Sequence, residues 1–155
     1  MHPNIIDNAA AITALIQNTK RIAVLGIKTE AASDQPAYYV PKYALDRGYD
    51  IVPIPVYYPE ATHILGRKVY RSVAEAAREV GPIDMVDVFR RPKDLASHAD
   101  DILAAKPKSV WLQLGIEDNA FATRLANAGI TVVQNRCLMV ELRQRHANGT
   151  GQPNR

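Results

Sequence analysis

Arg21-Ile22-Ala23-Val24-Leu25-Gly26 is a short apolar run that stops at a glycine, and a helix-like segment begins about ten residues later. The run predicts a buried strand that feeds a glycine turn. A residue without Cβ lets the backbone come close to a phosphate, and the next helix points free N–H groups at the anion. The stretch therefore predicts the opening βα unit of a nucleotide-binding fold.

The dinucleotide fingerprint is missing after this turn. Residues 27–35 contain no second or third glycine, although a Gly-x-Gly-x-x-Gly turn holds the pyrophosphate in the common NAD fold. The acidic residue that would hold the ribose hydroxyls is also missing after the next predicted strand, where Tyr57 and Tyr58 stand. Both absences weigh against an ordinary NAD site.

Strands and helices alternate along the chain. The predicted strands are 21–26, 51–56, 65–70, 84–89, 109–114 and 130–134, and the predicted helices are 4–19, 36–47, 72–80, 92–105, 118–128 and 138–146. Asn4 is expected to cap the first helix, and Pro41 predicts a kink or a late start in the second. The alternation predicts a three-layer α/β/α fold with a mostly parallel sheet.

Length and composition limit the class of protein. The 155 residues, 47% of them hydrophobic, predict a single domain over residues 4–145 and a polar, flexible tail over 146–155. The net charge of +3 without long Lys or Arg runs argues against a nucleic-acid partner. No apolar run approaches the ~20 residues that span a membrane. One cysteine forms no internal disulfide, no metal cluster is indicated, and a cytoplasmic protein that can self-associate is expected.

Ligands of parallel sheets bind beyond the carboxyl ends of the strands, so the candidate residues are those that follow each strand. Gly26 and Ile27 give close backbone approach, Lys28 gives a positive charge, and Ser33 offers a hydroxyl. These four residues are expected to hold a phosphate group.

The next strand ends supply an apolar wall and an anion site. Pro53, Ile54 and Val56 are expected to pack against an adenine face, with simple core packing as the alternative. Phe89 and Arg90 precede a second arginine and a predicted helix start, and arginine binds phosphate in a bidentate way.

Two polar residues follow the last strands. Gln113, close to Trp111, is expected to line the pocket. Cys137 is placed at the ligand edge, although a lone cysteine is more often a small buried hydrophobe than a nucleophile. No residue is assigned a catalytic or metal-binding role.

Six segments of the chain together resemble the small stand-alone coenzyme A-binding proteins, Rossmann-like domains similar to the CoA-binding domain of the succinyl-CoA synthetase α subunit. The segments are 23–26, 48–53, 64–66, 84–92, 110–115 and 135–138. The most specific are Asp-Val-Phe-Arg-Arg-Pro at 87–92 and Trp-Leu-Gln-Leu-Gly at 111–115. The chain departs from the family at Gln35-Pro36-Ala37, where Arg-Pro-Ser is usual, and in a longer loop after residue 56.

The resemblance implies coenzyme A as the ligand. Its diphosphate would lie over residues 26–28, its adenine would approach residues 53–56, and Phe89 and Arg90 would line the same cleft. The synthetase reaction does not carry over, because it uses a phosphorylated histidine from a further domain and a partner subunit. The expected function is that of a small CoA-binding or acyl-CoA-binding protein without a reaction of its own.

Two alternatives stay open. In an NAD(P)-linked oxidoreductase, Arg67 and Lys68 could serve a 2′-phosphate, although the missing glycines argue against this. In a redox module, Cys137 would pair with the thiol of CoA.

Overall fold

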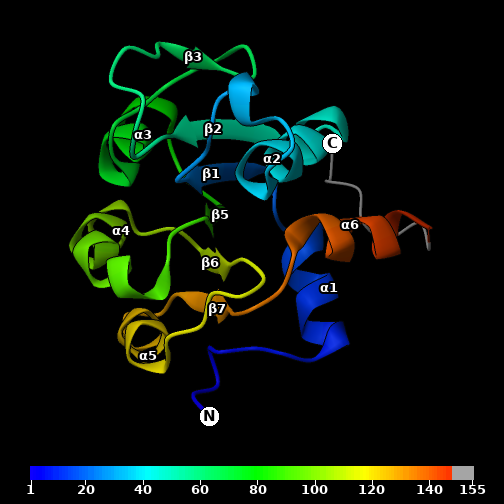
Figure 1. Ribbon diagram of the computed structural model, residues 1–155. Coiled ribbons are helices and arrows are strands. Elements are labelled where there is room, and N and C mark those ends of the chain that lie inside the picture. Colours follow the sequence, from blue (N-terminus) through cyan, green and yellow to red (C-terminus); the bar gives the residue numbers. More distant parts are fainter. Residues whose placement is uncertain (148–155) are drawn as a thin grey trace.

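Five parallel strands form the central sheet of the computed structural model, which describes residues 1–147 (Figure 1). They are β1 (Arg21–Leu25), β2 (Asp50–Ile54), β5 (Met85–Val88), β6 (Ser109–Leu112) and β7 (Thr131–Val133), in the order β2-β1-β5-β6-β7. Three helices, α1 (Ala9–Gln17), α2 (Pro36–Asp46) and α6 (Leu138–Ala147), cover one face of the sheet. The other face is covered by α3 (Val73–Val80), α4 (Ala99–Ala105) and α5 (Asn119–Asn127). The predicted fold class, a Rossmann-like three-layer α/β/α domain, is confirmed.

Two apolar clusters hold these layers together, one on each face of the sheet. Strand β1 shows the division, because Ile22 and Val24 belong to the cluster beneath α1, α2 and α6, while Ala23 and Leu25 belong to the other. Both faces are covered, so the strands are apolar along their whole length rather than alternating. The sheet is thereby fixed as a rigid platform for the loops at its carboxyl edge.

The N-terminal helix starts later than predicted. Helix α1 begins at Ala9, and Asn8 caps it by accepting a hydrogen bond from the backbone N–H of Ala11 at 2.9 Å. The prediction that Asn4 is the cap is wrong, because the backbone around it pairs with β7. Val132 N–H donates to the carbonyl of Asn4 at 2.8 Å, and Ile6 N–H donates to the carbonyl of Val132 at 2.9 Å.

Helix α2 runs continuously through Pro41, so the expected late start is wrong. Proline has no N–H for the carbonyl four residues earlier, which here is that of Ala37. That carbonyl accepts the backbone N–H of Lys28 instead, at 3.1 Å. The proline therefore frees an acceptor that ties the loop after β1 to the first turn of α2.

The short strand predicted within 65–70 is present as β4 (Arg67–Lys68), but it does not join the parallel sheet. The structure has a separate antiparallel hairpin of β3 (His63–Ile64) and β4 (Arg67–Lys68), outside the parallel sheet. Leu65 and Gly66 form its turn with φ values of 54° and 72°, the left-handed conformation that a tight hairpin turn requires. The predicted helix over 92–105 also differs, because it opens with two 3₁₀ turns, Pro92–Asp94 and Ala96–His98, before α4.

The C-terminal region is described only in part. Helix α6 includes His146 and Ala147, the first two residues of the predicted tail, and residues 148–155 of that tail lie outside the described residues. Within residues 1–147, no helix combines the length and the apolar character that a membrane span requires.

Candidate functional site

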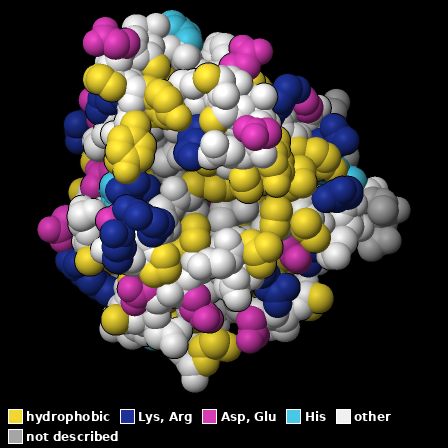
Figure 2. Space-filling model, viewed as in Figure 1, with side chains coloured by type: hydrophobic (Ala, Val, Ile, Leu, Met, Phe, Trp, Pro, Cys, Tyr) yellow, Lys and Arg dark blue, Asp and Glu magenta, His cyan; other side chains and the backbone are white. Residues whose placement is uncertain are grey.

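A cavity of about 430 Å³ opens at the carboxyl edge of the sheet, a size usual for a small-molecule site. It is lined by Lys28, Gln35, Pro36, Ala37, Tyr39, Phe89, Arg90, Arg91, Pro92, Gln113, Leu114, Gly115, Ile116 and Cys137. These residues come from the loops after β1, β5, β6 and β7 and from the start of α2. In Figure 2, hydrophobic side chains gather near the middle of one face, with a group of Lys and Arg side chains beside them.

Five of the sequence-predicted site residues come together in this cavity, and six do not line it. The five are Lys28, Phe89, Arg90, Gln113 and Cys137. The other six are Gly26, Ile27, Ser33, Pro53, Ile54 and Val56. The carboxyl ends of four neighbouring strands thus bring together residues that are far apart in the sequence.

The six residues outside the cavity have identifiable places. Ile27, Pro53 and Ile54 are buried, and the side chains of Ile27 and Ile54 pack on opposite faces of the sheet. Ser33 is exposed at the end of the 3₁₀ turn Glu30–Ala32. Val56 is exposed beyond the end of β2, so it offers an apolar surface on the β2 side of the sheet edge.

Gly26 lies where the loops after β1 and β5 touch. Its φ is +88°, and a Cβ atom at this position would lie 2.5 Å from the carbonyl oxygen of Phe89. Its N–H donates to the carbonyl of Ile54 at 2.8 Å. The loop after β5 therefore leaves no room for a side chain at position 26. The glycine lets the loop that carries Lys28 lie beside Phe89.

Lys28 lies at the N-terminus of α2. Its Nζ donates a hydrogen bond to Oε1 of Gln35, the residue that precedes the helix. Gln35 makes no side-chain cap bond to α2. A lysine beside the positive end of a helix is a suitable site for an anion.

Arg90 provides the second cation of the cavity wall. Its Nε donates to Nε2 of His98 at 3.1 Å, and its Nη2 lies 3.7 Å from Oδ2 of Asp94. Because Nε2 accepts this bond, the His98 ring is neutral and carries its proton on Nδ1. Burial and the charge of Arg90 lower the pKa of His98, against an opposing effect of Asp94 and Asp101. The guanidinium is thus oriented before any ligand arrives.

Arg71 fixes the loop on the other side of Arg90. Its guanidinium donates to the carbonyl groups of Tyr58 at 3.1 Å, Pro59 at 3.2 Å and Ala61 at 2.7 Å. The same loop carries Tyr57, whose exposed ring lies 5.7 Å from the guanidinium carbon of Arg90. The loop after β2 therefore continues the sheet edge past the cavity with an exposed aromatic surface.

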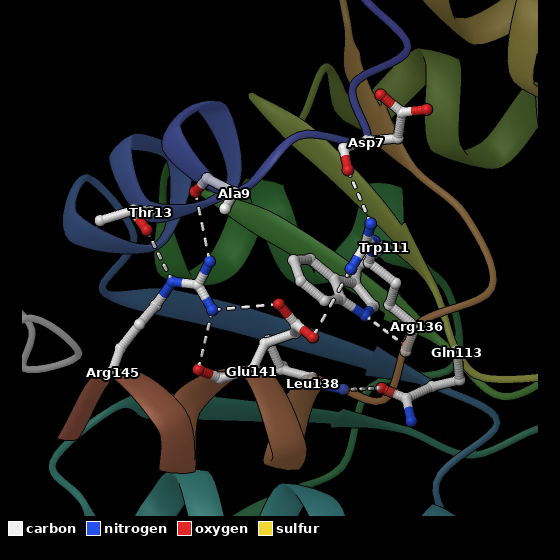
Figure 3. Close-up of polar contacts among 9 residues, drawn as sticks. All are labelled: Asp7, Ala9, Thr13, Trp111, Gln113, Arg136, Leu138, Glu141 and Arg145. Atoms are coloured by element: carbon white, nitrogen blue, oxygen red, sulfur yellow. Dashed lines mark hydrogen bonds and ion pairs between the residues drawn. The ribbon is translucent and has the colours of Figure 1, made fainter. Parts of the chain in front are cut away.

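The loop between β7 and α6 is anchored to β6 by two side chains (Figure 3). Trp111 Nε1 donates to the carbonyl of Arg136 at 2.8 Å, and the N–H of Leu138 donates to Oε1 of Gln113 at 3.1 Å. Arg136 in turn donates from Nη2 to the carbonyl of Asp7 at 2.6 Å. These bonds hold the half-buried thiol of Cys137, which lies between the two anchored residues, at the cavity wall.

Asp87 lies in the central strand below the cavity, paired in register with Val24 and Trp111. It is fully buried, and neither carboxyl oxygen has a hydrogen-bond partner among the described residues. Burial raises the pKa of this carboxyl well above its ordinary value. An apolar core favours the neutral form of an acid that has no partner for its charge.

Sequence reasoning missed the contribution of the first turn of α2, Gln35 to Tyr39, and of the segment 114–116. The rule that a helix N-terminus follows the first strand could have indicated the α2 residues. The segment 114–116 follows β6 and overlaps the motif at 111–115, so the strand-end rule could have indicated it as well. Within residues 1–147, no group of three or more His, Cys, Asp or Glu side chains is arranged to hold a metal ion.

The fold and this cavity define a Rossmann-like α/β domain whose candidate ligand site lies at the carboxyl edge of a parallel sheet. Residues 20–143 match the family described as the CoA binding domain, and the chain belongs to that family.

Several proteins are similar to this chain over most of its length. An uncharacterized protein of Bacillus subtilis, YneT, is 34% identical over 131 residues, which are 84% of this chain and 91% of that protein. A solved structure from Thermus thermophilus, titled as cell-free ID.343, is 36% identical with a TM-score of 0.76, covering 89% of this chain and 98% of the other. A hypothetical protein from Pyrococcus horikoshii OT3 is 28% identical with a TM-score of 0.77, covering 93% and 95%.

Proposed function

We propose that this protein binds coenzyme A, free or as an acyl thioester, in the cavity at the carboxyl edge of the sheet. The main support is that Lys28, Arg90 and the N-terminus of α2 lie together on the wall of an otherwise mostly apolar cavity. Such a wall suits a ligand that has both an anionic part and an apolar part. Membership of the CoA binding domain family supports the same ligand.

The proposed orientation follows the charge distribution. The diphosphate lies between Lys28 and Arg90, where charge-assisted hydrogen bonds form. The adenine lies toward the exposed side chains of Val56 and Tyr57, with buried Pro53 and Ile54 behind them. The pantetheine arm then runs in the other direction, toward the strand ends that carry Gln113 and Cys137.

We propose a binding role rather than catalysis. Among the residues that line the cavity within the described chain there is no Asp, Glu or His, and the polar groups that are present, such as Lys28, Arg90 and Gln113, suit the binding of phosphate and amide groups.

Ligand-dependent melting tests the proposal, with CoA, acetyl-CoA, NAD and NADP compared on the same protein. At a ligand concentration 100 times the Kd, binding raises the free energy of unfolding by about 2.7 kcal/mol. We expect a Kd in the roughly micromolar range. We expect this shift with CoA and acetyl-CoA. A shift with NAD or NADP and none with CoA would favour the oxidoreductase alternative instead.

A second candidate role rests on the position of Cys137 in the cavity wall. Its thiolate would attack oxidised CoA, form a mixed disulfide with one CoA and release the other as a free thiol. Incubation of the native protein with oxidised CoA, followed by intact mass measurement, tests this role. One CoA adduct that is lost in Cys137→Ser supports it, and an unchanged mass of the native protein contradicts it while leaving reversible binding untouched.

A cytoplasmic location and self-association stay predictions. Light scattering on the purified protein tests the second, since a homo-oligomer gives a multiple of the 17.1 kDa chain mass.

A further inference from the structure

The side-chain amide of Gln113 makes a hydrogen bond within the protein through its oxygen only. The side chain follows β6, lines the cavity and is only 4% exposed. Its Oε1 accepts the backbone N–H of Leu138, the first residue of α6, at 3.1 Å. The first N–H groups of a helix have no partner inside the helix, so Gln113 acts as a cap supplied by a distant strand.

This bond also fixes which way the amide faces. A backbone N–H can only donate, so the oxygen of Gln113 must face Leu138 and the nitrogen must face away from it. No hydrogen bond joins that nitrogen to another group among residues 1–147, and Figure 3 shows it without a contact to the residues drawn. A nearly buried amide on a cavity wall thus keeps two N–H donors that no described protein group accepts. The nitrogen is not among the fully buried side-chain atoms without a partner, so it reaches the open space of the cavity, where a ligand can accept its hydrogens.

Capping alone does not explain an amide at this position. A glutamate has the same length, its oxygen would accept the Leu138 N–H equally well, and its charge would interact favourably with the positive end of α6. What glutamine provides beyond glutamate is the pair of N–H donors.

We propose that Gln113 is an oriented hydrogen-bond donor for a carbonyl oxygen of the ligand, in an amide or a thioester. This inference rests on the proposed function. The charged residues of the cavity, Lys28, Arg90 and Arg91, follow β1 and β5. Gln113 is instead followed along the wall by Leu114, Gly115 and Ile116. A neutral donor beside apolar side chains is complementary to a neutral acceptor, such as the amide carbonyls of a pantetheine arm.

The experiment compares two ligands on four proteins. The ligands are CoA and its nucleotide half, 3′-phosphoadenosine 5′-diphosphate, which lacks the pantetheine amides. The proteins are the wild type, Gln113→Glu, Gln113→Met and the control Gln134→Glu. Gln134 follows the neighbouring strand β7, but its Nε2 donates to Oδ1 of Asn119 at 3.1 Å and it does not line the cavity.

We expect both Gln113 variants to bind CoA about tenfold more weakly, the effect of one lost hydrogen bond with its buried partner. Affinity for the nucleotide half should change less than about twofold, and Gln134→Glu should bind both ligands as the wild type does. Gln113→Glu keeps an oxygen that accepts the Leu138 N–H, so the start of α6 stays capped in this variant. Gln113→Met has no charge and keeps the test valid if the glutamate variant does not fold.

The outcomes separate this inference from the proposed function. A wild type that binds neither ligand overturns the proposed function, and the inference with it. A wild type that binds CoA, with Gln113 variants that lose nothing or lose equally on both ligands, overturns the role of Gln113 and leaves CoA binding in place.

Discussion

Gly26 and Phe89 approach so closely that a Cβ atom on the glycine would lie 2.5 Å from the phenylalanine carbonyl oxygen. The two residues directly follow the neighbouring strands β1 and β5, and Phe89 N–H donates to the carbonyl of Leu25 at 2.9 Å. Because the loops are packed backbone to backbone, the cations that follow them, Lys28 and Arg90, reach the same cavity.

Gly26→Ala should therefore destabilise the fold as well as the site. The positive φ alone costs about 1 kcal/mol for a residue with a Cβ, and the overpacking adds about 1–3 kcal/mol. Gly129→Ala is the matched control, because Gly129 has the same φ of +88° and no atom within 4 Å of its added Cβ. Denaturant unfolding measures the stability of both variants. If both lose the same free energy of unfolding, the contact with Phe89 adjusts to the new methyl group without cost.

Lys28→Ala and Arg90→Ala should each weaken CoA binding by about 1.5–3 kcal/mol, the range for a hydrogen bond to a charged group. The loss should shrink as salt is added, because screening weakens the wild-type contact. Lys42→Ala serves as the control, since Lys42 pairs with Asp46 within α2 and does not line the cavity. Calorimetric titrations at low and high salt make the comparison, and two variants with wild-type affinity would assign Lys28 and Arg90 to the protein surface alone.

The layers of the fold were predictable because their signals are local. Apolar runs that end in turns and helices with one apolar face alternate along the chain, and both faces of a parallel sheet must be covered. Residues 4–6 and 65–70 were not predictable in this way. The first segment is held by Val132, far away in the sequence, and the second forms a hairpin through left-handed Leu65 and Gly66.

The site was predictable where it depends on strand ends, and less so where it depends on packing between elements. Lys28, Arg90 and Gln113 follow strands and do line the cavity. The role of Pro41 depends on a contact between α2 and the loop after β1, because it leaves the Ala37 carbonyl free for Lys28. No sequence pattern specifies such a contact.

His98→Gln should change how stability depends on pH. Burial and Arg90 hold the pKa of His98 below its ordinary 6.5, so the unfolded chain takes up a proton at a higher pH than the folded protein. The stability contributed by the neutral histidine is present above about pH 6.5 and is lost as the pH falls through the lowered pKa. Glutamine does not titrate, so the unfolding free energy of the wild type minus that of the variant should decrease on acidification. A difference that is constant between about pH 7.5 and pH 5 would contradict this coupling.

Asp87→Asn should produce the opposite trend. Burial raises the pKa of Asp87 well above the ordinary value of 3.8, so the folded protein keeps a proton that the unfolded chain has released. The stability that this carboxyl contributes is fully present below about pH 4 and is lost as the pH rises through the raised pKa, with a slope of up to about 1.4 kcal/mol per pH unit. The wild-type value minus the Asp87→Asn value should therefore fall as the pH rises.

Asp84→Asn provides the control, because the pKa of Asp84 is shifted in the opposite direction to that of Asp87. Asp84 directly precedes β5, the strand that contains Asp87. Burial alone would raise the pKa of Asp84, but hydrogen bonds from the backbone N–H groups of Arg21 and Lys20, and the ammonium of Lys108, lower it overall. Its contribution is present above about pH 4 and is lost in acid. Unfolding curves across the pH range should thus show the two differences moving in opposite directions. If the Asp87 difference stays flat from about pH 4 to pH 9, the carboxyl is not held neutral in the core, and a group that stabilises its charge must reach it in solution.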